Sequence, residues 1–340
     1  MAETSPAKVK VSEIRQVAIV VKDLQMVAKN YWDILGIGPW DVHEWEAPLV
    51  YDRTYHGKPA WARERIALAQ VGTLQLELVQ PVEGDSIYQD FLIEHGEGLH
   101  HMNFLVDDLD ETAEILSKQG FPSLQSAHRG PREHKGGYNY IDIKPLRAIW
   151  EPVHRGIGTG VEPTRYPDTM QESPAKVKVS NIAQIAIVVK DVQVVAENYW
   201  NILGIGPWDI YEWEASLVYD RTYHAKPAWA RERIALAQVG ALQLELVQPV
   251  EGDSIYQDFL MEHGERLHHL KFVVDNVDET ADILAKQGFP NLQGGHVGSP
   301  EYNAAYAYID IKPLRAIWEL SSISKDKGLK DMGIKSSHSP

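Results

Sequence analysis

The chain has 340 residues, no cysteine and a formal net charge of −15 at pH 7. This length is enough for two domains of ordinary size, each with a hydrophobic core of its own. Without cysteine the chain can form neither disulfides nor thiolate metal sites. Its negative charge repels phosphate backbones and anionic lipid surfaces, so we expect neither nucleic acid nor a membrane as a partner.

The first residues give no sign of export or of membrane anchoring. Residues 1–11 lack the apolar core of a signal peptide, and no apolar run of the chain approaches the roughly 20 residues that span a bilayer. We therefore expect a soluble, cytoplasmic protein.

An internal repeat dominates the sequence. The segment Pro6–Ser12 returns as Pro174–Ser180, and later matches, such as His101 with His269, keep the same offset of 168 residues. We predict a tandem duplication with domains over residues 6–154 and 174–321. Residues 155–173, rich in Gly, Pro and Thr, are expected to be a linker, and residues 322–340 a mobile C-terminal tail.

Each copy has the pattern of two similar modules. In the first copy, apolar and β-branched residues predict strands over residues 14–21, 40–45, 64–71, 74–80, 99–106, 138–143 and 148–153, and one near 124. Asp23 and Asp108 are the expected N-caps of two helices, which Gly36 and Gly120 end. Each copy is therefore predicted to contain two βαβββ modules.

An overlay of the two modules without gaps indicates a candidate site. Gln16 and His101 occupy the same place in successive modules, and the closing strand of each module carries one carboxylate, Glu77 or Glu151. Two modules related by a pseudo-twofold axis would bring these four side chains together. Two carboxylates neutralise a 2+ ion, and imidazole and amide oxygen complete its shell, so the four residues are a candidate metal site.

These paired modules resemble the vicinal oxygen chelate superfamily, which includes glyoxalase I, methylmalonyl-CoA epimerase, extradiol dioxygenases and bleomycin-resistance proteins. The resemblance covers nearly all of both copies and is closest to the epimerases along residues 75–81, 91–101 and 106–108. It implies an α+β fold of tandem domains, in each of which the two paired βαβββ modules form an incompletely closed, barrel-like sheet. Two such domains often pair in related enzymes, so the fused copies would form an intramolecular pseudo-dimer, with further homo-oligomers left open.

The resemblance also implies a ligand set. The second histidine of each pair, His101 or His269, would bind the metal, whereas His100 and His268 would be structural neighbours. The implied ligands of a divalent Zn, Co, Ni or Mn ion are Gln16, Glu77, His101 and Glu151 in one copy, and Gln184, Glu245, His269 and Glu319 in the other. Epimerases usually have histidine in place of the glutamine, so this shell resembles eukaryotic glyoxalase I instead. One histidine and two carboxylates per site favour a redox-silent Lewis acid over the two-histidine Fe(II) set of dioxygenases.

We therefore expect a divalent-metal-dependent isomerase or epimerase. It would move a proton alpha to a carbonyl through a metal-stabilised enolate, with an acyl thioester as a candidate substrate. By resemblance to glyoxalase I, Glu151 and Glu319 would act as base and ligand together, with Glu77 and Glu245 as partner carboxylates; the sequence does not decide which of each pair abstracts the proton. Two alternatives stay open, a glyoxalase I-type lyase acting on a thiol–aldehyde adduct and a non-catalytic, ligand-sequestering protein of the bleomycin-resistance kind.

Strand alternation adds candidate substrate contacts. Residues two apart share one face of a strand, so Asn103 should lie beside His101, and Lys271 beside His269. A neutral amide in one copy and an ammonium in the other predict two unequal sites. The same alternation makes Arg147 and Arg315 candidate anion clamps beside the carboxylates, with a surface salt bridge as the alternative.

Overall fold

The computed structural model of the chain describes residues 4–130, 136–155, 162–167, 172–214, 217–298, 304–323, 329 and 334–339. The chain forms two compact units, one of Val11–Ser180 with Pro313–Arg315, the other of Met1–Lys10 with Asn181–Lys312 and Ala316–Pro340. We call them the first-repeat unit and the second-repeat unit. The predicted tandem duplication is confirmed, although each unit takes up a leading segment that the repeat assigned to the other domain.

Those leading segments are fixed by similar contacts in the two units. In the second-repeat unit, Ser5 Oγ donates a hydrogen bond to the carbonyl of Trp200, at 2.6 Å. In the first-repeat unit, Ser173 Oγ donates to the carbonyl of Trp32. The repeated Pro-Ala-Lys-Val-Lys-Val-Ser segments therefore belong to the folded units as packed arms.

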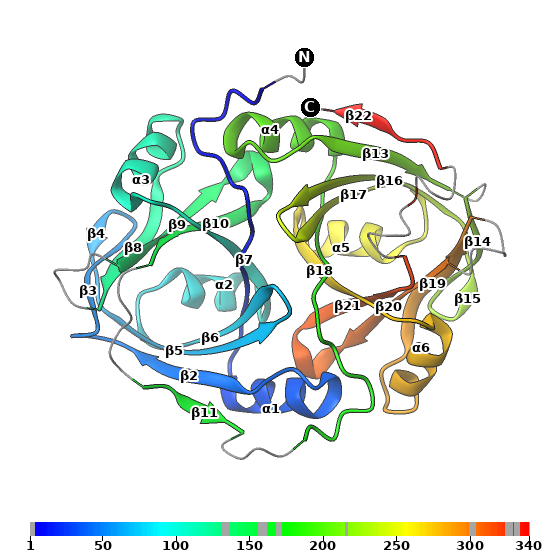
Figure 1. The fold of residues 1–340 in the computed structure, drawn as a ribbon, viewed down its shortest axis with the longest axis horizontal. Coiled ribbons are helices and arrows are strands. Elements are labelled where there is room, and N and C mark those ends of the chain that lie inside the picture. The colour runs from blue at the N-terminus through cyan, green and yellow to red at the C-terminus, as the bar shows by residue number, and fades with distance from the viewer. Residues whose placement is uncertain are drawn as a thin grey trace. The chain divides into compact units, whose positions relative to one another are not determined.

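The first-repeat unit is dominated by one sheet (Figure 1). Its strands are β1 (Gln16–Val20), β2 (Trp40–Trp45), β3 (Val50–Tyr55), β4 (Lys58–Pro59), β5 (Ala62–Val71), β6 (Leu74–Gly84), β7 (Gly98–Leu105), β8 (Ser123–Arg129), β9 (Gly136–Ile143), β10 (Ala148–His154) and β11 (Thr164–Tyr166). Its helices are α1 (Leu24–Leu35), α2 (Ile87–His95) and α3 (Leu109–Lys118).

The second-repeat unit repeats this plan. Its strands are β12 (Gln184–Val188), β13 (Trp208–Trp213), β14 (Val218–Tyr223), β15 (Lys226–Pro227), β16 (Ala230–Val239), β17 (Leu242–Gly252), β18 (Arg266–Val273), β19 (Asn291–Val297), β20 (Ala304–Ile311), β21 (Ala316–Ser321) and β22 (Ser337–Ser339). Its helices are α4 (Val192–Leu203), α5 (Ile255–His263) and α6 (Val277–Ala285).

The strand order of the first sheet explains how two modules make one unit. The order is β11-β2-β5-β6-β1-β7-β10-β9-β8-β3-β4, and its two ends do not pair, so the sheet stays open. At the centre β1 and β7 run antiparallel, and each lies parallel to the closing strand of its own module, β6 or β10. The predicted α+β fold of paired βαβββ modules with an incompletely closed sheet is confirmed.

The predicted caps set the ends of the helices. The Asp23 side chain accepts a hydrogen bond from the backbone N–H of Met26 at 2.9 Å, and Asp108 accepts one from Glu111 at the same distance. Gly36 ends α1 at φ 66°, a left-handed conformation that costs glycine little because it has no Cβ atom.

Several elements escaped prediction. The helix α2 buries only Ile87 and Tyr88, so its sequence shows too short an apolar stripe to reveal a helical period. The hairpin of β3 and β4 extends the sheet beside β8. Part of the predicted linker, Thr164–Tyr166, pairs with β2 as the edge strand β11.

The predicted C-terminal tail is partly built into the second-repeat unit. Ser337–Ser339 pairs with β13 as the edge strand β22, and Leu329 is buried. These described parts of the tail are therefore packed. The predicted mobility of the rest of the tail falls outside the described residues, at 324–328, 330–333 and 340. The same holds for the linker prediction at residues 156–161 and 168–171.

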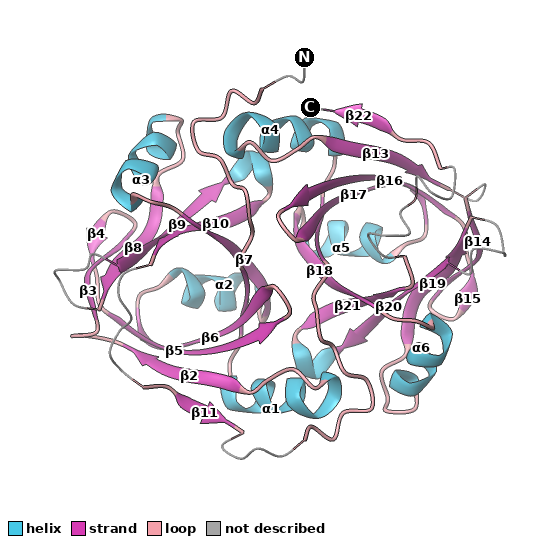
Figure 2. Cartoon of the chain, viewed as in Figure 1, coloured by secondary structure: helices cyan, strands magenta, loops and turns pink. Residues whose placement is uncertain are grey.

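Each unit has a core of its own on the face that carries α2 or α5. In the first-repeat unit this core includes Ile87 and Tyr88 of α2, Val20 of β1 and Tyr138 and Tyr140 of β9. The sheet curves around α2 in Figure 2, and α2 packs against β1 and β6. The central strands are thus buried on both faces, and a polar side chain there needs a partner.

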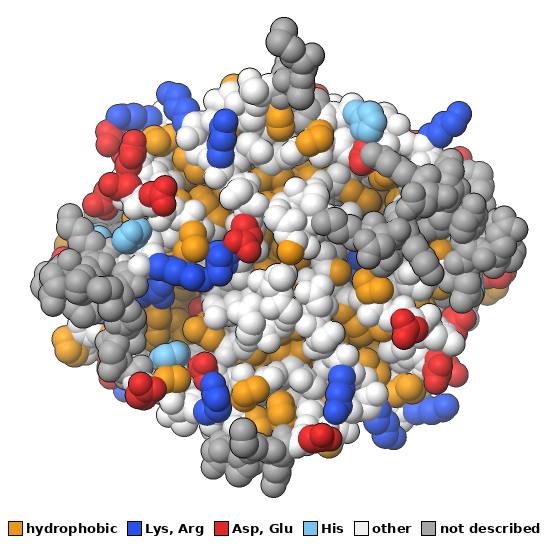
Figure 3. All heavy atoms as spheres, in the orientation of Figure 1, with side chains coloured by type: hydrophobic (Ala, Val, Ile, Leu, Met, Phe, Trp, Pro, Cys, Tyr) orange, Lys and Arg blue, Asp and Glu red, His pale blue; other side chains and the backbone are white. Residues whose placement is uncertain are grey.

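The surface and the helices bear on two further features of the chain. On the face drawn in Figure 3, acidic and basic side chains are interspersed. Among the helices of the described residues, none is long and apolar enough to cross a membrane.

Candidate metal centres

Four adjacent strands at the centre of each sheet bring one polar side chain each to the same buried face. In the first-repeat unit they are Gln16 on β1, Glu77 on β6, His101 on β7 and Glu151 on β10, all at most 6% exposed. In the second-repeat unit they are Gln184 on β12, Glu245 on β17, His269 on β18 and Glu319 on β21, all at most 5% exposed. The structure therefore brings the eight predicted ligands together as two sets of four.

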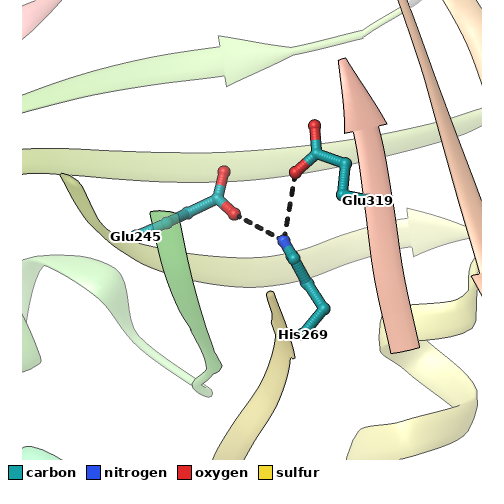
Figure 4. A group of neighbouring side chains, drawn as sticks. All are labelled: Glu245, His269 and Glu319. Atoms are coloured by element: carbon teal, nitrogen blue, oxygen red, sulfur yellow. Dashed lines mark ion pairs between the residues drawn. The ribbon is translucent and has the colours of Figure 1, made fainter. Parts of the chain in front are cut away.

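The histidine lies between the two carboxylates in each set. His101 Nε2 is 3.2 Å from Glu77 Oε2 and 3.5 Å from Glu151 Oε2. His269 Nε2 is 3.2 Å from Glu245 Oε2 and 3.2 Å from Glu319 Oε2. Figure 4 shows these last three side chains pointing toward one another, and their ligand atoms lie within 4.8 Å of each other.

The first histidine of each pair orients the second. His100 Nδ1 and His101 Nδ1 are 2.9 Å apart, as are His268 Nδ1 and His269 Nδ1. Because Nδ1 of His101 is held by its neighbour, its Nε2 points at the carboxylates. Burial and the nearby His269 and His263 lower the pKa of His268 well below its ordinary value, so Nδ1 of neutral His268 can accept a hydrogen bond from Nδ1–H of His269.

The carboxylates hold a proton on the central histidine. Burial would lower the pKa of His101, but its contacts with the Glu151 and Glu77 carboxylates outweigh burial and raise the pKa to about 9. The pKa of His269 is also raised, since Glu245 and Glu319 outweigh the burial that would lower it. An environment that stabilises a cation at this point also suits a metal cation.

The two centres differ at the predicted position. In the first-repeat unit the Asn103 amide donates to Gln16 Oε1 and, at 3.3 Å, to Glu151 Oε2. Lys271 holds the equivalent place, between Gln184 and Glu319 in the register of the sheet. Both terminal atoms of the buried Gln184 side chain lack a hydrogen-bond partner among the described residues.

One carboxylate of each centre has a shifted pKa. Burial raises the pKa of Glu77, outweighing the opposite effect of His101. Burial would also raise the pKa of Glu319, but Lys271 and His269 outweigh it and lower that pKa. Lys271 and His269 therefore stabilise the Glu319 anion.

A cavity of about 740 Å³ opens beside the second centre. Gln184, Glu245, Glu319 and Lys271 line it at the end next to the candidate centre. Its aromatic wall consists of Tyr211, Trp213, Tyr256, Tyr306 and Tyr308. Ile323 and Leu329, from the region of the predicted tail, also line the cavity, so the C-terminal segment contributes to this site.

Two kinds of site residue were missed in the sequence. Tyr308 lies with its ring centroid 5.0 Å from that of His269, and Tyr140 lies 4.9 Å from His101. The alternation of tyrosines along the predicted strand at 138–143 was the available signal. The second kind is the buried pair of Arg221 and Glu232, whose Nη1 and Oε2 atoms are 2.8 Å apart at the cavity wall.

The two predicted arginine clamps lie outside the strands. Arg147 and Arg315 have φ values of 57° and 58° and follow the short turns η2 (Lys144–Leu146) and η4 (Lys312–Leu314). Face alternation does not extend across such a turn. Arg315 Nε instead lies 3.1 Å from Glu97 Oε2. The described residues that line the cavity do not include Arg315. The anion-clamp role of Arg147 and Arg315 stays a prediction.

The donor set fits a divalent ion. Within the described residues, Glu77 Oε2, His101 Nε2, Glu245 Oε2 and His269 Nε2 are buried and lack a partner with hydrogen-bond geometry. Buried polar atoms without partners are rare in folded proteins, and a bound ion is one of the usual reasons for them. One imidazole nitrogen with carboxylate and amide oxygens suits Zn²⁺ and neighbouring first-row ions, as predicted.

Sequence comparison agrees with the predicted resemblance. Residues 15–140 and 183–306 match the family described as Glyoxalase/Bleomycin resistance protein/Dioxygenase superfamily. The "Uncharacterized protein YqjC" of Bacillus subtilis (strain 168) is 38% identical over 80 residues, which cover 24% of this chain and 55% of YqjC. The chain thus spans about half the length of this curated relative.

Two solved structures are similar over nearly the whole chain. A mutant of 4-hydroxymandelate synthase from Streptomyces coelicolor has a TM-score of 0.54 and 16% identity, covering 95% of this chain and 98% of that one. A xylose isomerase-like TIM barrel/4-hydroxyphenylpyruvate dioxygenase fusion protein has a TM-score of 0.53 and 12% identity, covering 94% and 50%. At these identities the likeness shows the fold alone. Because the family match extends over both repeats, the chain belongs to the Glyoxalase/Bleomycin resistance protein/Dioxygenase superfamily.

Proposed function

We propose that the chain is a divalent-metal-dependent enzyme that moves a proton on the carbon next to a carbonyl group, as an isomerase or epimerase does. The observation that carries the proposal is the buried arrangement of two carboxylates around one imidazole nitrogen, which occurs in both units. Such a set balances the charge of a 2+ ion and leaves room for a neutral amide oxygen.

In the second-repeat unit, Gln184, Glu245, His269 and Glu319 would hold the ion. The ion would supply Lewis acidity, polarising a carbonyl oxygen so that the neighbouring C–H bond becomes more acidic. The equivalent ligands of the first-repeat unit are Gln16, Glu77, His101 and Glu151.

We assign the proton transfer to Glu319 in the second-repeat unit. Its lowered pKa keeps it ionised at neutral pH, so that it can accept a proton at a carboxylate oxygen. Tyr308 and the aromatic wall of the cavity would shield the reacting carbon of a bound substrate from water. A positioned general base contributes about 10²–10⁴-fold, or roughly 3–5 kcal/mol of the barrier, so polarisation and positioning must supply the rest.

The test combines metal content with isotope exchange. Metal-free protein is reconstituted with Zn, Co, Ni or Mn, and bound metal per chain is measured. Deuterium uptake from D₂O into a panel of acyl thioesters and hemithioacetals is then followed by NMR. We expect exchange that depends on bound metal and falls about 10²–10⁴-fold in E319Q, with the first centre disabled by H101A in both proteins.

Two results would contradict the proposal. A protein that binds no divalent ion has no Lewis acid at this site. A protein that binds metal but exchanges no proton of any carbonyl compound is not a proton-transfer enzyme, and ligand binding without exchange would then indicate a sequestering protein.

The second candidate is a glyoxalase I-type lyase that acts on a thiol–aldehyde adduct. It is favoured by the glutamine ligands Gln16 and Gln184, because histidine is usual there in epimerases. The same NMR experiment separates the two. A lyase converts the hemithioacetal into a thioester, whereas an epimerase exchanges the proton of an acyl thioester and gives its epimer, with the same bonds between the same atoms.

A further inference from the structure

The two centres share their ligands but differ in one charge, Asn103 against Lys271. We propose that the cavity of the second-repeat unit recognises a carbonyl compound that carries one carboxylate, and that Lys271 binds this carboxylate. This inference rests on the proposed function and specifies the substrate class of that same site. It also assigns the substrate to one repeat only.

The position of Lys271 is the first argument. Lys271 is partly buried, lines the cavity, and lies between Gln184 and Glu319 in the register of the sheet. Among the described residues, no carboxylate forms an ion pair with it. Asn103 has the opposite arrangement, because its amide is already bound to Gln16 and Glu151. The Lys271 ammonium is therefore available to a ligand in the cavity, whereas the Asn103 amide is already hydrogen-bonded to protein side chains.

The charge balance is the second argument. Glu77 and Glu151 carry a formal charge of −2, whereas Glu245, Glu319 and Lys271 together carry −1. A divalent ion therefore neutralises the first centre and leaves one positive charge at the second. An unbalanced charge in a buried cavity is costly, and a singly charged anion removes that cost.

The rest of the cavity narrows the class further. The other cation that lines the cavity within the described residues, Arg221, is bound to Glu232 through two hydrogen bonds. One free cation matches a carboxylate better than a phosphate, which carries a charge of about −1.5 to −2 at pH 7. The aromatic wall with Tyr211, Trp213 and Tyr306 and the volume of about 740 Å³ suit a bulky apolar group on the same molecule.

The experiment compares a charged and an uncharged probe of the same shape. Binding of 2-oxo-4-phenylbutanoate and of its primary amide to the zinc-loaded full chain is measured by isothermal titration calorimetry. The variant K271N gives the second centre the side chain of the first, and so it should fold. The control K226N removes the charge of an exposed lysine in the same unit.

We expect wild type to bind one molecule of the acid per chain, more tightly than the amide. K271N should weaken binding of the acid at least about tenfold, which corresponds to a loss of roughly 1.4 kcal/mol in binding free energy. Its affinity for the amide should stay within about twofold of the wild-type value. K226N should change neither, and K271R should retain the preference for the acid.

Three results would overturn the inference: equal affinities of wild type for acid and amide, an unchanged acid affinity in K271N, or two equivalent acid sites per chain. If these occur while zinc is bound at both centres, the inference fails and the proposed function stands. If wild type binds no zinc, the proposed function fails and this inference with it.

Discussion

At the scale of the residue, the histidine pair explains how a β-strand presents one ligand. The pairing of β1 with β7 shifts register at this point, and the rings of both His100 and His101 lie near Tyr88 of α2. Their Nδ1 atoms are 2.9 Å apart. The bond fixes the imidazole plane of His101 and leaves Nε2 for the carboxylates. The sequence alone predicted which histidine faces inward, because strand alternation and the family resemblance agreed. It could not show the contact between the two rings, because the register shift at this point of β7 interrupts the regular alternation of a strand.

The raised pKa of His101 predicts that zinc binding releases a proton. Since this pKa is about 9 in the metal-free protein, His101 is protonated at pH 7 and zinc must displace that proton. The apparent zinc affinity should therefore rise about tenfold per pH unit up to about pH 9 and level off above it. The first centre can be measured alone in H269A by calorimetry in buffers of different ionisation enthalpy. A binding heat that does not depend on the buffer would contradict a protonated His101.

At the scale of the element, the sequence predicted the long strands that are filled with apolar residues. It did not predict the elements whose formation depends on contacts with segments that are distant in sequence. The strands β1, β6, β7 and β10, which carry the site, have apolar patterns that need no tertiary information. The edge strand β11 exists because Thr164–Tyr166 finds the free edge of β2, a partner far away in sequence. The alternation argument for the arginine clamps has a similar limit, since Arg147, directly before β10, has a left-handed backbone that the sequence did not reveal. The clamp role itself stays a prediction.

We expect the buried ion pair of Arg53 and Glu64 to hold the β3–β4 hairpin to strand β5. Arg53 on β3 is 6% exposed and Glu64 on β5 is 2% exposed, with Nη1 and Oε2 2.8 Å apart. R53A would leave a buried carboxylate without its partner, so we expect a loss of about 3–5 kcal/mol in the free energy of unfolding. The double variant R53M/E64L replaces both charges by apolar groups and should recover most of this loss.

Urea denaturation of the metal-free protein, followed by circular dichroism, measures both variants. The equivalent pair, Arg221 and Glu232, offers a matched control in the other unit through R221M/E232L. If R53A unfolds within about 1 kcal/mol of wild type, which is the range of exposed pairs, the two side chains do not hold the hairpin.

At the scale of the whole molecule, duplication has produced two units with the same scaffold and different centres. Each unit has its own sheet and its own core cluster. Each also includes a leading arm that lies outside its own repeat in sequence, residues 4–10 in one case and 172–180 in the other. The offset of the repeat revealed the duplication, but not this exchange of arms, because the arms have the same sequence in both copies and sequence similarity cannot say which unit they join.

The unequal charge of the two centres predicts two classes of metal site. Lys271 repels a dication at the second centre, and two unit charges 4 Å apart near a protein surface already interact by about 4 kcal/mol. The Asn103 hydrogen bonds that a metal would displace at the first centre are worth only about 0.5–1.5 kcal/mol each. The repulsion by Lys271 outweighs the loss of the Asn103 hydrogen bonds. The first centre should therefore bind zinc at least about tenfold more tightly than the second.

A competition titration of the metal-free chain with zinc and a coloured chelator resolves the two classes. H101A should remove the tight class and H269A the weak one, whereas K271N should bring the second centre close to the first by giving it the same formal charge. Because K271N leaves both ligand sets intact, it separates charge from coordination. Equal zinc affinities at the two centres of wild type, each assigned with the single-histidine variants, would show that Lys271 does not set the difference.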